Sequence, residues 1–222
     1  MPSTTALHDL TAHELAAGYQ ASRFSPVEVA QAVLAQIERW EPRIAATWLL
    51  RPELALEQAR AAEARWLRRG PMGARDGVPI PNKDNIAPRG APVPLGTRAT
   101  PLVPAPADAP PAARLREAGA VLITKTTMPD YGMLSSGLSS FHALARNPWD
   151  LRTTPGGSSA GGGAAAAAGY GPLHIGTDIG GSLRLPAGWC GIFSLKPSLG
   201  RIPIDPPYTG RAAGPMPRVV AA

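Results

Sequence analysis

The sequence predicts an α/β fold, in which helices are layered on a β-sheet. Helix start signals and apolar residues at helical spacing fill residues 1–70, whereas short β-type runs alternate with helices from residue 71 onward. Such alternation is typical of an α/β layer architecture. The chain has 222 residues, of which 44% are hydrophobic, so it can bury a core of its own or be a piece of a larger domain. We expect an N-terminal helical segment over residues 1–70 and a core over residues 71–222.

Two capping boxes predict where the first two helices begin. Thr11–Glu14 and Ser25–Glu28 both place a hydroxyl residue three positions before a glutamate. Pro26 occupies the first position of the second helix, where its missing N–H costs nothing. Apolar residues then recur at helical spacing as far as Trp40. Because proline interrupts helices, we expect this helix to end at Glu41-Pro42.

The remaining elements are expected to be two helices and three short strands. A third helix runs from Pro52 to Arg69 and ends at Gly70. In the core, a helix spans about Pro110 to Ala118, with Asp108 or a neighbour at its N-cap. The strands are expected at Gly77–Ile80, Ala120–Thr124 and Gly191–Leu195.

The composition and charge of the chain argue against several classes of protein. The net charge is +6, but the basic residues are mostly arginines scattered along the helices, which indicates a solvated surface and not a nucleic-acid-binding stripe. Cys190 is the single cysteine, so there is neither a disulfide framework nor a zinc set, and a reducing cytoplasm is the expected compartment. The N-terminus lacks the pattern of a signal peptide and no apolar run could span a bilayer, so neither secretion nor a membrane location is expected.

A glycine-rich stretch from Thr154 to Arg184 is the strongest functional signal. It contains two serines, Ser158 and Ser182, and each directly follows a pair of glycines. Glycine pairs let backbone N–H groups approach a ligand closely. A serine surrounded by backbone donors is what an acyl-transfer site requires.

Two other interpretations of this stretch are weaker. Gly157–Gly161 matches the G-x-S-x-G nucleophile elbow, which would make Ser159 the nucleophile. That arrangement needs an acid followed by a histidine, whereas here His174 precedes Asp178 and no suitable histidine follows. The other interpretation is a phosphate-binding loop, but the stretch lacks the lysine and the adjacent serine or threonine of a P-loop.

Three motifs together resemble the amidase signature family. They are PGGSSAGGGAAAAAG, GTDIGGSLRLPAGWCGIFSLKPSLGRIP and, upstream of both, GVPIPNKDNI. The resemblance covers nearly the whole chain and keeps the order and spacing of the family. It implies the amidase signature fold, a mixed β-sheet core flanked by helices. It also implies a Ser-cisSer-Lys triad formed by Lys83, Ser158 and Ser182.

The resemblance implies a role for each member of the triad. Ser182 attacks the amide carbonyl and becomes a seryl acyl-enzyme, and the products are a carboxylate and ammonia. Ser158, preceded by a cis peptide bond, relays the proton of Ser182 to a neutral Lys83. Burial favours the neutral form of an amine, so Lys83 is expected to be buried with a lowered pKa. No cofactor and no metal ion are implied.

The loop before Ser182 is expected to stabilise the transition state. The N–H groups of Ile179, Gly180, Gly181 and Ser182 match the positions of the family's oxyanion hole, and such donors stabilise developing negative charge.

Other residues near the triad are expected to support it. Asp178 and Arg184 are expected to pair and brace the loop. For Ser159 two roles stay open, a hydrogen bond near the site and a cap for the alanine-rich helix that follows. Cys190 is expected to be a buried structural thiol. His142 and His174 have no partners at metal-ligand spacing and receive no function.

The chain departs from the family pattern in three places. Pro81-Asn82 stand before Lys83 where the family usually has apolar strand residues, which could shift the lysine. Phe193-Ser194 replace a small apolar residue and a glycine. Family members are about twice as long, so we interpret the chain as the N-terminal half of an amidase, with a truncated fold. Residues 1–222 alone are expected to be inactive and prone to aggregate.

Three functional hypotheses follow from these motifs. The first is an amidase that acts on a small-molecule amide. The second is the glutaminase component of a tRNA-dependent amidotransferase, in which nucleic acid is involved only through partner subunits. The third is an inactive truncated amidase fragment. A homodimer is compatible with each, and the sequence does not identify the amide.

Overall fold

The structure is a computed structural model that describes residues 5–198 and 201–203. Its strands are β1 (Thr47–Leu50), β2 (Asn82–Lys83) and β3 (Thr124–Thr126). Its helices are α1 (Ala12–Gln20), α2 (Pro26–Ile44), α3 (Pro52–Leu67), α4 (Pro110–Glu117), α5 (Ala160–Ala167) and α6 (Arg184–Cys190), with two short 3₁₀ turns at Leu7–Asp9 and Asp130–Gly132.

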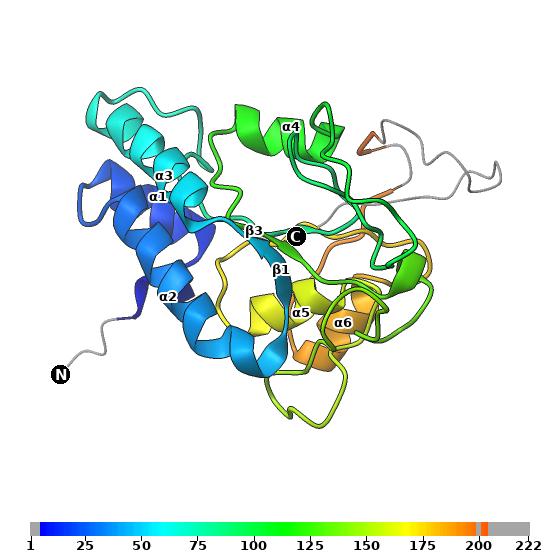
Figure 1. Ribbon diagram of the computed structural model, residues 1–222. Coiled ribbons are helices and arrows are strands. Elements are labelled where there is room, and N and C mark those ends of the chain that lie inside the picture. Colours follow the sequence, from blue (N-terminus) through cyan, green and yellow to red (C-terminus); the bar gives the residue numbers. More distant parts are fainter. Residues whose placement is uncertain (1–4, 199–200, 204–222) are drawn as a thin grey trace.

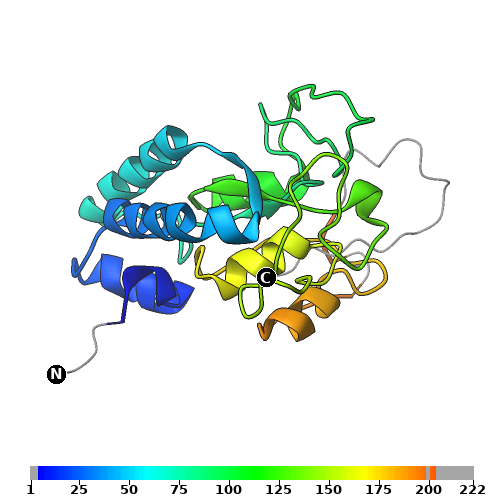
Figure 2. The same cartoon turned by 60° about the horizontal axis from the view of Figure 1, so that its bottom comes forward.

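The three strands form a mixed sheet in the order β1-β3-β2. β1 is antiparallel to β3, with Leu50 opposite Thr124, and β2 is parallel to β3, with Lys83 opposite Thr126. Figures 1 and 2 show α1, α2 and α3 grouped together, α4 on one side of the strands, and α5 and α6 on the other. The predicted α/β class with a mixed sheet and flanking helices is therefore confirmed.

Both predicted capping boxes are present. In α1 the Thr11 hydroxyl accepts from the Glu14 N–H, and the Glu14 carboxylate accepts from the Thr11 N–H. Ser25 and Glu28 make the same reciprocal pair at the start of α2. These contacts involve residues only three apart, which is why the sequence alone reveals them.

The prediction that the second helix ends at Glu41-Pro42 is wrong, because α2 continues to Ile44 with Pro42 inside it. Pro42 lies in the last turn, so its missing N–H removes only one bond near the end of the helix. The helix stops at Ala45, which adopts a left-handed conformation with φ 47° and donates its N–H to the Glu41 carbonyl.

The main core lies where α2, α3 and α5 meet the strands. The apolar face of α2 includes Val33 and Ile37, and it packs against small residues such as Ala59 of α3 and Ala164 of α5. Tyr170 is fully buried in the same cluster. Because the alanine side chains are small, the helices can approach one another closely. α5, which directly follows the glycine-rich residues around Ser158, therefore packs tightly against this core.

The predicted strands are only partly correct. Within Gly77–Ile80 there is one isolated bridge, Pro79 to Val121, and the regular strand lies further on at Asn82–Lys83. The run predicted at Ala120–Thr124 becomes a strand only at Thr124. Gly191–Leu195 forms no strand, and Phe193 there is 85% exposed. Strand formation requires a distant partner, which local sequence does not specify.

The N-cap of α4 is a neighbour of Asp108, which agrees with the expectation, and the side chain of Asp108 itself does not cap the helix. The N-cap is Ala109, and it makes no side-chain cap hydrogen bond. Asp108 instead accepts from the Arg89 N–H at 2.7 Å and forms an ion pair with Arg116 at 2.8 Å. It therefore ties α4 to the preceding loop.

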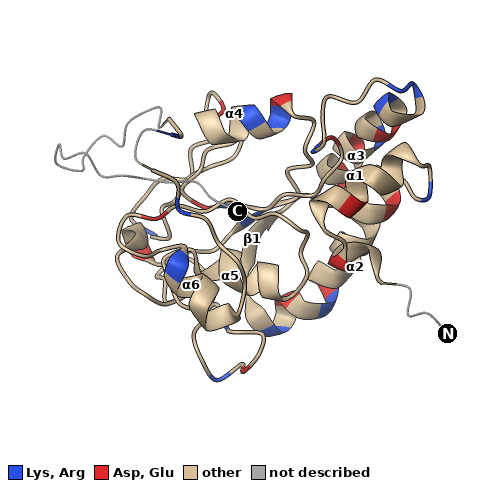
Figure 3. Ribbon diagram, turned by 180° about the vertical axis from the view of Figure 1, so that it is seen from behind, with Lys and Arg blue, Asp and Glu red and all other residues tan. Residues whose placement is uncertain are grey.

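Charged residues are spread over the helices. Figure 3 shows basic and acidic residues interspersed along the ribbons of α1, α2 and α3. Among the described helices, none combines the length and apolar character needed to cross a bilayer.

Candidate active site

Lys83 lies at the centre of the candidate site. It is on β2 and is fully buried. Its Nζ donates to Ser158 Oγ at 2.8 Å and to Thr177 Oγ1 at 3.1 Å. Asn85 Nδ2 also donates to Thr177 Oγ1, at 3.0 Å. The lysine nitrogen thus lies between two hydroxyl groups from segments that are 75 and 94 residues away in the sequence.

Pro81 does not move Lys83 away from this site. The Pro81 carbonyl accepts from the Ile175 N–H at 2.9 Å, and the Lys83 N–H donates to the Ile175 carbonyl at 2.8 Å. Asn82 bridges to Ile175 as well. Proline has no N–H to donate, but its carbonyl can still accept a hydrogen bond. The Pro81–Lys83 segment therefore pairs with the extended segment around Ile175.

Ser158 is held in a tightly packed position. The peptide bond between Gly157 and Ser158 is cis. A Cβ on Gly157 would lie 2.5 Å from the Ser136 nitrogen, so only glycine fits there. Gly132 has φ +70°, and a Cβ on it would lie 3.1 Å from Ser158 Oγ. Two glycines therefore let loop 132–136 close directly over Ser158.

Ser158 and Ser182 open onto the same cavity. The cavity has a volume of about 300 Å³. Polar groups in its wall include Asn85, Ser158, Thr177 and Ser182, and the apolar part is formed by Leu95, Met128, Tyr131, Met133, Leu134, Ile179 and Leu185. Ser182 is partly buried, immediately before α6, and its carbonyl accepts from the Ser159 N–H at 3.1 Å. The structure thus places Ser158 and Ser182 in the wall of one cavity, and Lys83, which is fully buried, in contact with Ser158.

Asp178 organises the loop that leads to Ser182. Its buried carboxylate accepts from the backbone N–H groups of Gly181, Leu183 and Arg184, and it forms an ion pair with the Arg184 side chain at 2.9 Å. Burial alone would raise the pKa of Asp178, but Arg184 and these N–H donors together hold it well below its usual range. The expected pairing of Asp178 with Arg184 is present.

The backbone donors before Ser182 differ in their availability. The N–H of Gly181 donates to Asp178 Oδ1 at 2.8 Å, so it is already used within the loop. No described residue accepts from the N–H groups of Ile179, Gly180 and Ser182. A Cβ on Gly180 would meet no atom within 4 Å, which shows open space beside the loop. Among the described residues, these three N–H groups therefore have no acceptor.

Ser159 supports the site through its side chain and its backbone. It occupies the N-cap position of α5 but its hydroxyl caps no helix N–H. The hydroxyl donates instead to the Thr177 carbonyl at 3.2 Å. Together with the bond from its N–H to Ser182, this contact links the segments of Ser158, Thr177 and Ser182. The sequence left two roles open for Ser159, and in the structure its hydroxyl makes the hydrogen bond near the site and does not cap the helix.

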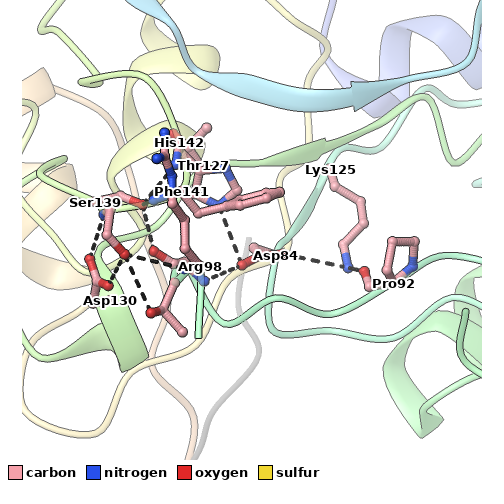
Figure 4. A network of polar contacts seen from close by, with 12 residues as sticks. Asp84, Pro92, Arg98, Lys125, Thr127, Asp130, Ser139, Phe141 and His142 are labelled. Atoms are coloured by element: carbon pink, nitrogen blue, oxygen red, sulfur yellow. Dashed lines mark hydrogen bonds and ion pairs between the residues drawn. The ribbon is translucent and has the colours of Figure 1, made fainter. Parts of the chain in front are cut away.

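Behind Lys83 lies a buried polar network that the sequence does not predict. Asp84 lies between Lys125 and His142, as Figure 4 shows. Its Oδ1 faces Lys125 Nζ at 3.8 Å, and its Oδ2 is 3.4 Å from His142 Nε2. Burial lowers the pKa of Lys125 to about 8, and Asp84 opposes that shift. Thr177 and Asn85 were missed too, although both lie inside motifs that carry triad residues.

Cys190 is buried and His174 is half-buried, and both are ordinary structural residues. Burial raises the pKa of the Cys190 thiol to about 12, and its Sγ lies 3.5 Å from the Pro155 carbonyl. Burial lowers the pKa of His174 to about 4, so this ring is neutral near pH 7. Neither residue contacts the triad side chains.

Comparison with known proteins gives a consistent result. The profile of the amidase family matches residues 28–220. One relative, the A component of glutamyl-tRNA(Gln) amidotransferase from Methylococcus capsulatus, is 44% identical over 196 residues, which are 88% of this chain and 40% of that protein. The same component from Chloroflexus aurantiacus is 43% identical over 198 residues, with 89% and 41% covered. The chain thus spans about two fifths of the length of these relatives.

Several solved structures have the same fold, and they are described as an amidase or a hydrolase. Fatty acid amide hydrolase has a TM-score of 0.93 at 27% identity, with 100% of this chain and 40% of that chain covered. The 6-aminohexanoate cyclic dimer hydrolase has a TM-score of 0.87 at 30% identity, with 98% and 44% covered. A crystal structure described as amidase has a TM-score of 0.83 at 34% identity, with 88% and 44% covered.

Proposed function

The chain belongs to the amidase family, and on this basis we propose that it carries the catalytic residues of an enzyme that hydrolyses a carboxamide to a carboxylate and ammonia. The observation that supports this most strongly is the 2.8 Å contact between the buried Lys83 Nζ and Ser158 Oγ, in the wall of a cavity that Ser182 also lines. A serine hydroxyl is a poor nucleophile until a base takes its proton, and this arrangement supplies the base.

In the proposed reaction, Ser182 Oγ attacks the amide carbonyl carbon and forms a C–O bond. Its proton passes to Ser158 Oγ while Ser158 gives its own proton to the neutral Lys83 Nζ. When the C–N bond breaks, a proton returns along the same path to the leaving nitrogen, which departs as ammonia. Water then attacks the acyl-enzyme ester, and the carboxylate leaves with Ser182 restored.

The neutral state of Lys83 is supported by its surroundings. Complete removal from water disfavours the ammonium form of a lysine. The partners at 2.8 and 3.1 Å are hydroxyl groups, which can donate to a neutral amine as well as accept from an ammonium. Proton transfer from Ser158 to Lys83 therefore requires little movement of heavy atoms.

We propose that the loop leading to Ser182 stabilises the negative charge that develops on the carbonyl oxygen. The N–H groups of Ile179, Gly180 and Ser182 have no described acceptor, so they are the proposed oxyanion donors. Gly181 contributes differently, because its N–H and the Asp178–Arg184 pair fix the shape of the loop. Removal of one oxyanion donor typically costs about 10²–10³ in kcat.

A second candidate function is the glutaminase component of a tRNA-dependent amidotransferase. It is favoured by the relatives at 43–44% identity, which are named as the A component of such an enzyme. In that case the amide is glutamine and the ammonia is used by a partner protein. The two candidates share the triad, so the substrate distinguishes them. The single cysteine, a buried thiol, fits a reducing cytoplasm in either case.

The proposed function is tested by measuring ammonia release from a panel of amides by the intact protein. The panel contains glutamine, asparagine, aliphatic carboxamides and aryl amides. Release that falls at least about 10⁴-fold in Ser182→Ala supports the assignment of the nucleophile. Preference for glutamine favours the second candidate. A folded protein that hydrolyses none of these amides, or an active Ser182→Ala variant, contradicts the proposal.

A further inference from the structure

We propose that Asp84 is a positioning residue that sets the location of Lys83 relative to Ser158, an inference that rests on the proposed function of the triad. Asp84 directly follows Lys83, and its side chain is completely buried. Its carboxylate joins the chain next to the base to two separate loops and to the adjacent strand. The following contacts carry this inference.

β2 is a short strand that is held by a few backbone hydrogen bonds. It is a strand of two residues, Asn82–Lys83, and a strand that short makes few ladder hydrogen bonds. On the far side of Lys83, the Asp84 N–H donates to the Thr126 carbonyl at 3.0 Å. Because the lysine side chain has a limited length, the position of its Cα restricts which hydroxyl groups its Nζ can reach. A side-chain anchor at the next residue therefore bears directly on the base.

The Asp84 carboxylate anchors the strand to the cavity wall. Its Oδ2 accepts from the Gly96 N–H at 2.7 Å. Gly96 has φ +69°, and a Cβ on it would lie 2.4 Å from the Pro129 carbonyl oxygen, so its backbone is closely surrounded. The adjacent Leu95 lines the cavity and accepts from the Tyr131 N–H at 2.7 Å. One carboxylate thus connects the segment of Lys83 to the wall that faces Ser158 and Ser182.

Lys125 balances the charge of Asp84. Both side chains are buried, with Lys125 Nζ 3.8 Å from Asp84 Oδ1 and hydrogen-bonded to the Pro92 carbonyl at 2.8 Å. His142 approaches the other carboxylate oxygen at 3.4 Å. A buried charge that loses its partner is strongly destabilising, so a change at Asp84 alone would confuse lost positioning with an unpaired lysine.

The test therefore compares two double variants of the intact protein with equal charge. Asp84→Asn/Lys125→Met and Asp84→Ala/Lys125→Met both lack the two charges, but only the asparagine keeps an oxygen that can accept from Gly96. We expect the asparagine variant to keep kcat for the best amide within about threefold, and the alanine variant to lose at least about tenfold with KM little changed. Equal kcat in the two variants would overturn the inference.

A structural measurement keeps the inference testable without an assay. In a crystal structure of the alanine double variant, we expect Lys83 Nζ and Ser158 Oγ to be separated by more than about 3.5 Å, beyond a hydrogen bond. A contact unchanged from 2.8 Å in that variant would overturn the inference even if no amide substrate is found. An inactive wild type would instead contradict the proposed function, so the two failures are distinct.

Asp76→Asn is the matched control. Asp76 is also completely buried and ion-paired, with Arg65, but it joins α3 to the segment that follows α3. This variant is expected to unfold at lower temperature while kcat stays within about threefold of wild type. If Asp76→Asn lowers kcat as much as the alanine double variant, the effect at Asp84 reflects general loss of stability and the inference fails.

Discussion

Lys83 and Lys125 are two buried lysines on adjacent strands, and their surroundings differ. β2 and β3 pair so that Asn82 is opposite Lys125 and Lys83 is opposite Thr126. Lys83 Nζ contacts the hydroxyl groups of Ser158 and Thr177, whereas Lys125 Nζ contacts the Pro92 carbonyl and faces the Asp84 carboxylate. Burial alone therefore does not identify a catalytic lysine; the chemistry of its partners does.

The difference has a direct consequence for proton transfer. Ser158 can give a proton to Lys83, because a hydroxyl is both donor and acceptor. The Pro92 carbonyl and the ionised form of the Asp84 carboxylate can only accept, and they favour a lysine that keeps its proton. We thus propose a catalytic role for Lys83 and a structural role for Lys125.

The largest expected effect separates the two lysines by activity. Lys83→Met should lower kcat by about 10³-fold, because the proton of Ser182 then has no base, whereas Asp84→Asn/Lys125→Met, which removes Lys125 without leaving Asp84 as an unpaired charge, should stay within about threefold. In the wild type the rate should rise with pH until Lys83 is neutral and then level off. Steady-state hydrolysis by folded variants checks this. Equal losses in the two variants would remove the distinction on which the comparison depends.

An intermediate effect is expected in the pH dependence of stability. The pKa of Lys125 is lowered from 10.5 to about 8 in the folded protein, so between these pH values the folded state has lost a proton that the unfolded state still holds. The free energy of unfolding should therefore rise with pH in this window, by up to about 3 kcal/mol, and Lys125 should add no slope below pH 8.

Denaturant unfolding of wild type and Lys125→Met between pH 7 and 10.5 isolates that contribution. Burial raises the pKa of Tyr19, which lowers stability above about pH 10, but this effect is common to both proteins and cancels in the difference. Parallel curves for the two proteins would mean that Lys125 titrates alike in the folded and unfolded states.

The smallest expected effect concerns the second hydroxyl partner of Lys83. Thr177→Val keeps the shape of the side chain but removes the oxygen that contacts Lys83 Nζ and Asn85 Nδ2. We expect kcat to fall by about tenfold, since the substitution removes two hydrogen bonds and one neutral hydrogen bond contributes about 1 kcal/mol. Thr124→Val, at a buried threonine of β3 that contacts no triad residue, is the control and should leave kcat unchanged. A Thr177→Val enzyme with wild-type kcat would show that Ser158 alone orients the lysine.

The sequence predicts features that depend on neighbours in the chain and misses those that depend on distant partners. The capping boxes at Thr11 and Ser25 need only residues three positions away, so they are recognised directly. The strand register is different, because β3 pairs with segments more than 40 residues upstream and its ends are fixed by those partners.

The candidate site shows the same division. The glycine pairs before Ser158 and Ser182 mark these serines locally, whereas their combination with Lys83 depends on the family resemblance, because 75 residues separate the lysine from Ser158. Asp84, Lys125 and His142 belong to common residue types, and only the folded arrangement shows that they are buried together. A buried network of this kind has no signature in a single sequence.

The most direct test of the account maps where a serine-reactive fluorophosphonate attaches, and how fast, in three forms of the intact protein. Mass spectrometry of the peptides should place the adduct on Ser182 in wild type, Asp84→Asn/Lys125→Met and Lys83→Met. Labelling should proceed at nearly the wild-type rate in Asp84→Asn/Lys125→Met and at least about 10²-fold more slowly in Lys83→Met. An adduct on Ser159, or equal labelling rates in wild type and Lys83→Met, would contradict the assignment of Ser182 as nucleophile and Lys83 as its base.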